Sequence, residues 1–313
     1  MTYNVPDYDD LPYHEELEMR SAWGVFGDDD QIGTLNFITN ECVKAAGAEV
    51  QKGKVFNLSL PLNLPDPPIF RESYKHVIYR PSRNSQDDYL DNFYMQNSTQ
   101  WDSLRHIQAR EFGFYNGVSE QDAGPDGDKL GIDRYVEKGI VGRGVLVDVP
   151  RYFAAKGEPY NAREETFIDP DLLDAILEHQ GTRLQPGDLL LLRTGYVRAY
   201  LDASREEREG FKGRSHCAGL TASEPTARYL WNKRIAAICA DNPAVEVIPG
   251  RPEDGFLHRR LIPMLGFALG ELFDYEALAA DCAEDRRYTC SFTGVPLYIP
   301  GGVGSPGNAV AVK

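Results

Sequence analysis

Residues 184–195 of this 313-residue chain read LQPGDLLLLRTG, with four consecutive leucines between a Pro-Gly-Asp turn and a glycine. A short apolar run bounded by Gly, Pro or Asp is typical of a strand whose two faces are both covered. GVLVDV (144–149) and IAAICAD (235–241) have the same character. The sequence therefore predicts three buried strands in its middle third.

Helical patterns lie between these strands. DPDLLDAILEHQG (169–181) offers Asp169 as N-cap and Pro170 in the first turn, and SEPTARYLWNKR (223–234) has a similar opening. Alternation of strands and helices favours an α/β fold. We find no internal repeat, low-complexity tract or linker, which indicates one domain over residues 1–313.

An N-terminal arm of about 37 residues is expected at the edge of this domain. Its first 20 residues look irregular, and SAWGVFGDDDQIGTLNF (21–37) is rich in Gly and Asp. A solvent loop would not need Trp23, Phe26 and Phe37, so the arm should pack against the domain.

The other segments give weaker signals. A helix over 39–53, capped by Thr39 or Asn40, and a strand over 54–62 are expected. LPDPPIF (64–70) contains three prolines and predicts a long loop to about residue 92. The C-terminal part predicts an apolar helical segment near 257–281 and a strand over 288–299.

Charge and cysteine usage narrow the class of protein. The formal net charge is −15, with 48 acids against 33 bases, so nucleic acid and anionic membrane surfaces are not expected as partners. No apolar run approaches the about 18 residues of a membrane helix, and the acidic N-terminus does not resemble a signal peptide. Five scattered cysteines without a C-x-x-C pair predict reduced thiols and a cytoplasmic location.

QNSTQWDSLRH (96–106) is the strongest candidate site. Gln96, Gln100, Asp102 and His106 all have even numbers, so an extended chain places them on one face, whereas a helix separates the glutamines from the Asp–His pair. Asp and His together can bind a divalent metal or relay a proton. The plainer alternative is that Asp102 caps a turn and His106 is a hydrogen-bonded, partly buried histidine.

His258 and Glu271 form a second candidate pair. On an unbroken helix they would face different ways, but Pro263 and Gly266 between them can break the helix. Glu271 stands in the apolar run LGFALGELF, where a carboxylate is costly to bury unless something binds it. The alternative is a glutamate on a solvent-facing helix surface. A minor further candidate is a nucleophile pair of His216 and Cys217.

The candidate site resembles the motif H-x-G-T-H-x-D-x-P-x-H of the cyclase family, which includes kynurenine formamidases and isatin hydrolases. Thr99, Asp102 and His106 match this motif, while Gln96 and Gln100 replace its two metal-binding histidines. His258 and Glu271 match a later histidine and carboxylate of the family's ligand set. The resemblance extends along nearly the whole chain through WGVFGDDDQIGTLN, GIDRYVEKGIVGRGVLVDV, LQPGDLLLLRTG, ADNPAVEV and GSPGNAVAVK, as in a longer, tryptophan- and glycine-rich branch of the family.

The resemblance implies a swivelling β/β/α-type single domain, with a mixed sheet and flanking helices, that forms homo-oligomers. It also implies a metal-assisted hydrolase of a cyclic or open amide, lactone or ester, with Asp102 and His106 performing acid–base catalysis.

Glutamine offers a harder and weaker ligand than imidazole, so three outcomes are open. In the first outcome a divalent metal, Mn or Zn, persists on Asp102, His258 and Glu271, with Gln100 as a weak oxygen ligand. The metal can instead be absent, with Asp102 and His106 acting alone, as a cyclase or lyase would, while the amides hold a carbonyl or oxyanion. In the third outcome the chain is an inactive small-molecule-binding protein.

The aromatic residues around the site favour a small-molecule substrate with an aromatic or apolar body. We expect Gln96, Gln100, Tyr115 of GFYNG (113–117) and Trp23 to bind it.

Overall fold

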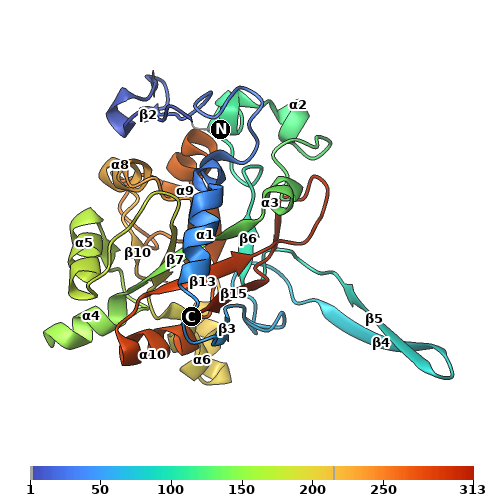
Figure 1. The fold of residues 1–313 in the computed structure, drawn as a ribbon. Helices are drawn as coiled ribbons and strands as arrows, with labels where there is room; N and C mark the ends of the chain where they lie inside the picture. Colours follow the sequence, from blue (N-terminus) through green and yellow to red (C-terminus); the bar gives the residue numbers. More distant parts are fainter. Residues whose placement is uncertain (1–2, 214–215) are drawn as a thin grey trace.

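A mixed sheet of nine strands forms the centre of the computed structural model, which describes residues 3–213 and 216–313 (Figure 1). The strands follow the order β14, β6, β12, β11, β9, β7, β13, β15, β3. The four central strands are mutually parallel, and every strand outside them runs antiparallel to its neighbour. Their bounds are β3 (Val55–Asn57), β6 (Gln100–Asp102), β7 (Ile140–Asp148), β9 (Leu189–Arg193), β11 (Ala237–Ala240), β12 (Ala268–Glu271), β13 (Thr289–Gly294), β14 (Gly304–Pro306) and β15 (Ala309–Val312).

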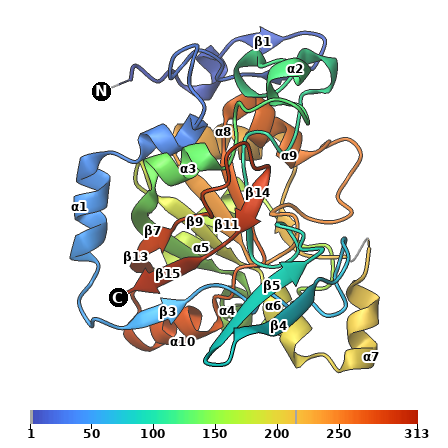
Figure 2. The same cartoon turned by 90° about the vertical axis from the view of Figure 1, so that its right-hand side faces the viewer.

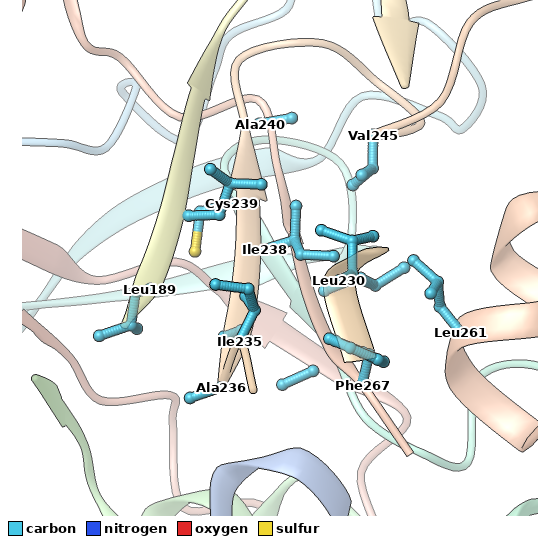
Figure 3. Close-up of a cluster of buried hydrophobic side chains, with 14 of the residues drawn as sticks. Leu189, Leu230, Ile235, Ala236, Ile238, Cys239, Ala240, Val245, Leu261 and Phe267 are labelled. Carbon is cyan, nitrogen blue, oxygen red and sulfur yellow. The ribbon is translucent and has the colours of Figure 1, made fainter. Parts of the chain in front are cut away.

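The three strands predicted from apolar runs are β7, β9 and β11, three of the four central parallel strands. All residues of β9 and β11 are buried, as expected for strands covered on both faces. Figure 3 shows Leu189 of β9 and Ile238 of β11 in one apolar cluster with Leu230, Leu261 and Phe267. This packing confirms the predicted α/β class.

Helices flank the sheet. They are α1 (Asn40–Ala48), α2 (Glu120–Ala123), α3 (Asp133–Lys138), α4 (Val149–Lys156), α5 (Pro170–His179), α6 (Tyr196–Asp202), α7 (Arg205–Arg208), α8 (Glu224–Asn232), α9 (Leu257–Arg259) and α10 (Glu276–Asp285). The predicted N-caps form: Thr39 accepts from the Cys42 amide and Asp169 from the Leu172 amide. The predicted helix over 39–53 ends earlier, at Ala48. No helix among the described residues has the length and apolar character needed to cross a membrane.

The N-terminal arm lies at one end of the molecule, over α8 and α9 (Figure 2). It contains the short strands β1 (Tyr13–His14) and β2 (Met19–Arg20). Phe26 is buried against Phe37 and Trp231, and the Trp231 indole donates a 3.0 Å hydrogen bond to the Pro6 carbonyl. The arm therefore packs on the domain through its aromatic residues, as the sequence predicts.

The expected long loop to residue 92 is wrong for its second half. β4 (Lys75–Ser82) and β5 (Ser85–Asp91) form an antiparallel hairpin that projects from the body (Figure 1). Sequence patterning missed it because almost all of its side chains are exposed, so no alternation of buried and polar residues marks the strands. Pro81 lies beside the turn, where the strand register shifts.

The expected helical segment near 257–281 is also wrong in part. α9 continues into a π-helical turn over Arg260–Leu265, and Gly266, with a φ of 73°, ends it. The chain then forms strand β12 before α10 begins. A short apolar run does not distinguish a buried strand from a buried helix, which explains the error. Two further short strands, β8 (Phe167–Ile168) and β10 (Gly219–Leu220), pair in parallel.

Candidate active site

Neighbouring strands β6 and β12 place the first three site residues. Gln100 and Asp102 are two residues apart on β6, so their side chains share a face, and Glu271 of β12 lies directly opposite Gln100 in the antiparallel register. The Gln100 amide nitrogen donates to Glu271 Oε2 at 2.8 Å. All three side chains are buried.

Gln96 and His106 reach the same place from outside the strand. The Gln96 amide nitrogen donates to Asp102 Oδ1 and lies 3.3 Å from His106 Nδ1. The extended stretch covers residues 100–102 alone, and a turn after Asp102 bends the chain back, with the His106 amide bonded to the Ser103 carbonyl at 3.0 Å. The four residues converge as predicted, but the predicted continuous extended geometry is wrong.

α9 and β12 bring His258 and Glu271 together with Asp102. The break at Gly266 lets both side chains point to one spot, and His258 Nε2 lies 3.1 Å from Glu271 Oε1. Ligand atoms of Asp102, His258 and Glu271 all lie within 4.8 Å of one another. Asp102 Oδ2 is buried and has no hydrogen-bond partner among the described residues.

Glu246 is a site residue that sequence analysis missed. Its Oε1 lies 2.7 Å from His258 Nδ1 and accepts from the His258 amide at 3.2 Å, while its Oε2 accepts from the Leu257 amide at 2.6 Å. This carboxylate therefore fixes both the turn that begins α9 and the ring of His258. Its sequence signal was weak: Glu246 stands between the apolar residues Ala244, Val245 and Val247, where a carboxylate is costly to bury without a partner.

Comparison with known proteins identifies the family. Residues 56–247 match the family model named Cyclase. This chain belongs to the cyclase family. A crystal structure described as a novel cyclase is 36% identical, with a TM-score of 0.81, and the alignment covers 94% of this chain and 99% of that one.

Isatin hydrolases share the cyclase fold. Isatin hydrolase A from Labrenzia aggregata, bound to benzyl benzoate, is 17% identical with a TM-score of 0.58, covering 87% of this chain and 97% of that one. An isatin hydrolase bound to the product analogue thioisatinate gives the same identity and TM-score, covering 88% and 98%. The comparison with curated proteins returned no match.

Burial sets the electrostatics of this cyclase site. Burial, followed by the nearby Asp102 charge, raises the pKa of the Glu271 carboxyl to about 7. Burial disfavours the His258 imidazolium, but hydrogen bonds to Glu246 and Glu271 outweigh it and raise the pKa of His258 well above its usual value. Glu271 and His258 therefore hold protons more strongly than usual when no metal ion balances the charge of the carboxylates.

His106 behaves in the opposite way. Burial lowers the pKa of its imidazole, and the Asp102 charge offsets this effect in part. At neutral pH the ring is neutral and has a lone pair that can accept a proton. His106 and His258 therefore have different protonation states within one site.

The residues of the cluster fit a divalent cation. Two carboxylates and one imidazole are ligands that Mn²⁺ and Zn²⁺ both accept, and the unpartnered Asp102 Oδ2 leaves a ligand position open. Gln100 presents its amide nitrogen to Glu271, and a nitrogen donor is not a metal ligand in this orientation. The structure thus places the glutamines as hydrogen-bond donors to the carboxylates.

Two expected substrate-binding aromatics lie elsewhere. Trp23 donates to the Pro263 carbonyl at 2.7 Å, and Tyr115 is fully buried with its hydroxyl 3.1 Å from Asp30. Among the described residues, neither ring has a hydrogen bond or ring contact with Gln96, Asp102 or His106. Both residues hold the N-terminal arm in place.

The minor candidate pair is a poor nucleophile site. Burial raises the pKa of the Cys217 thiol to about 12, which keeps the thiol protonated and unreactive at neutral pH. His216 lies 3.6 Å from Glu165.

Proposed function

We propose that this cyclase-family chain is a hydrolase that adds water to the carbonyl of a cyclic or open amide, a lactone or an ester. The observation that carries the proposal is the convergence of Asp102, His258 and Glu271 within 4.8 Å, beside the neutral imidazole of His106. Such a cluster joins a cation-binding carboxylate pair to a proton acceptor.

Asp102, His258 and Glu271 would hold the cation. When bound, a divalent metal, Mn or Zn, supplies a water of lowered pKa and polarises a carbonyl oxygen. Gln100 holds the Glu271 carboxylate by its 2.8 Å hydrogen bond, and Gln96 holds Asp102. These bonds keep the remaining carboxylate oxygens directed at the shared position.

His106 transfers protons. Its neutral imidazole accepts a proton from the attacking water, and the resulting imidazolium donates a proton to the leaving nitrogen or oxygen. The Asp102 carboxylate stabilises the imidazolium, and the Gln96 amide restrains the ring at Nδ1. Water addition and leaving-group departure then share one histidine.

A metal-independent cyclase or lyase reaction is the second candidate function. Both ring nitrogens of His258 already have carboxylate partners, at 2.7 and 3.1 Å, so its imidazolium can balance the carboxylates without a metal. Asp102 and His106 would then perform the acid–base steps, with the glutamines placing a carbonyl. An inactive small-molecule-binding protein is the remaining alternative.

We infer a small-molecule substrate with an aromatic or apolar body, and the similar fold of isatin hydrolases that bind benzyl benzoate and thioisatinate supports this class.

We also propose a cytoplasmic homo-oligomer with no nucleic-acid or membrane partner. The net charge of −15 supports the last point, and the exposed Ile78 and Tyr89 of the β4–β5 hairpin support self-association.

The test combines metal analysis with an activity screen. Protein purified without chelators is assayed on a panel of lactones, amides and aryl esters, with and without EDTA. Bound metal with EDTA-sensitive hydrolysis supports the metal-assisted hydrolase. Activity without metal supports the second candidate, and ligand binding without turnover on any substrate of the panel contradicts an enzyme function.

A further inference from the structure

An arginine from the proline-rich segment stands beside the site. Arg71 follows LPDPPIF, is half-buried, and donates from Nη1 to the backbone carbonyl of Gln96. Gln96 is also the residue whose side chain contacts Asp102 and His106. Burial is the main cause of the pKa shifts of His106 and Glu271, and the Arg71 charge makes a smaller contribution that favours the deprotonated form of each, so the guanidinium lies within electrostatic reach of both groups.

This arginine has no anionic partner in the part of the chain that the structure describes. Among residues 3–213 and 216–313, no carboxylate lies within 4.0 Å of Arg71, and the guanidinium donates to the Gln96 carbonyl. Two other arginines near the sheet are paired with acids: Arg193 contacts Asp148 and Glu276, and Arg143 contacts Asp188. The buried Arg105 also has no carboxylate partner among the described residues, but its guanidinium donates to three backbone carbonyls, whereas that of Arg71 donates to one. A guanidinium has several N–H donors in a planar fork, and one backbone carbonyl leaves most of them available.

The surrounding charge indicates what these donors are for. Asp102, Glu246 and Glu271 are buried nearby and would repel an anionic ligand. A fixed, unpaired guanidinium at the rim compensates that repulsion at one place. Planar bidentate contacts from Arg favour a carboxylate over a neutral polar group.

We propose that Arg71 binds a carboxylate group of the ligand and thereby makes this enzyme selective for carboxylate-bearing substrates or products. The inference rests on the proposed active site, but it does not depend on which reaction the site performs. Arg71 acts at the rim as a specificity-determining residue, while His106 and the cation-binding cluster act on the scissile carbonyl.

Binding of a matched pair of probes tests the carboxylate preference. Benzoate and benzamide have nearly the same shape and differ in charge, and their affinities are measured by calorimetry for wild type, Arg71→Met and Arg80→Met. Arg80 is an exposed arginine of β4 and controls for the loss of one positive charge. We expect wild type and Arg80→Met to prefer benzoate about 10-fold or more, and Arg71→Met to lose this preference with little change for benzamide.

Further arms separate the alternatives. Arg71→Lys retains the charge without the planar fork and should keep a reduced preference, and it serves if Arg71→Met does not fold. Benzoate affinity that EDTA abolishes and Arg71→Met leaves intact would assign the carboxylate to the metal and overturn the proposal. Unchanged benzoate affinity in Arg71→Met would overturn it as well.

Turnover distinguishes the source of the carboxylate. The 4-nitrophenyl monoester of succinate, which carries one free carboxylate, is compared with 4-nitrophenyl butyrate, which carries none. A selective rise in KM of Arg71→Met for the succinate ester assigns Arg71 to the substrate, whereas selective loss of product inhibition assigns it to the product. If neither ester is hydrolysed but the benzoate preference follows Arg71, the hydrolase proposal fails and the carboxylate site stands.

Discussion

The two sides of the site carry different kinds of side chain. On one side Asp102, His258 and Glu271 form a compact cluster, and the Glu246 carboxylate contacts Nδ1 of the His258 ring. On the other side are Gln96 and Gln100, and their amide nitrogens face the carboxylates of Asp102 and Glu271. The difference shows how a cluster of buried carboxylates is held together: the glutamine amides donate to Asp102 and Glu271, and His258 contributes a positive charge.

Removal of His106 is expected to have the largest effect. His106→Ala should lower kcat by about 10²–10⁴-fold, since it removes the proton acceptor while the cluster remains. Steady-state kinetics on the substrate found by the screen measure this change. His76→Ala, in the exposed hairpin, is the matched control, and equal activities of the two variants would remove His106 from the mechanism.

The carboxylate side is tested through Glu246. Glu246→Gln weakens the hydrogen bonds that fix the His258 ring. It should lower divalent-metal affinity by about 10–100-fold, which is the usual effect of removing a residue that hydrogen-bonds a metal-binding histidine. Glu253→Gln, on the exposed loop seven residues further on, should bind metal as wild type does. Calorimetric titration with Mn²⁺ makes the measurement. Identical affinities in both variants would show that Glu246 is purely structural.

The pH dependence sharpens the same contrast. The folded-state pKa of Glu271 is raised from 4.5 to about 7 and that of His258 is also raised, so the folded chain binds more protons than the unfolded chain. The metal-free protein should therefore lose stability as pH rises from about 4.5 through 7, whereas metal binding should strengthen over that range. Thermal melts of wild type and Glu271→Gln across this range provide the check. A wild-type slope that Glu271→Gln does not reduce would contradict the assignment.

Substitution of a glutamine should have a smaller effect on the site than the changes described above. Gln100→Ala removes one hydrogen bond to a buried carboxylate and should lower the free energy of unfolding by about 1.5–3 kcal/mol. Metal should still bind, because the amide donates to Glu271 and does not ligate. Urea titration measures the first effect and calorimetry the second. Abolished metal binding in Gln100→Ala would instead restore glutamine as a ligand.

Sequence patterning predicted the parts that depend on local signals. The leucine run of β9 and the even spacing of Gln100 and Asp102 are local, and both predictions agree with the structure. The β4–β5 hairpin was missed because its exposed strands carry no burial pattern, and β12 because a short apolar run suits helix and strand alike. Glu246 and Arg71 reach the site through tertiary contacts with His258 and Gln96, which no local pattern records.

Metal stoichiometry tests the central claim most directly. Chelator-stripped wild type and Asp102→Asn are titrated with Mn²⁺ and Zn²⁺ by calorimetry, and the loaded proteins are checked by elemental analysis. Wild type should bind one divalent ion per chain, and Asp102→Asn, which alters the open Oδ2 position, should bind far more weakly while its melting temperature stays near that of wild type. Absence of binding in wild type, or equal affinity in Asp102→Asn, would contradict a cation site built on Asp102, His258 and Glu271.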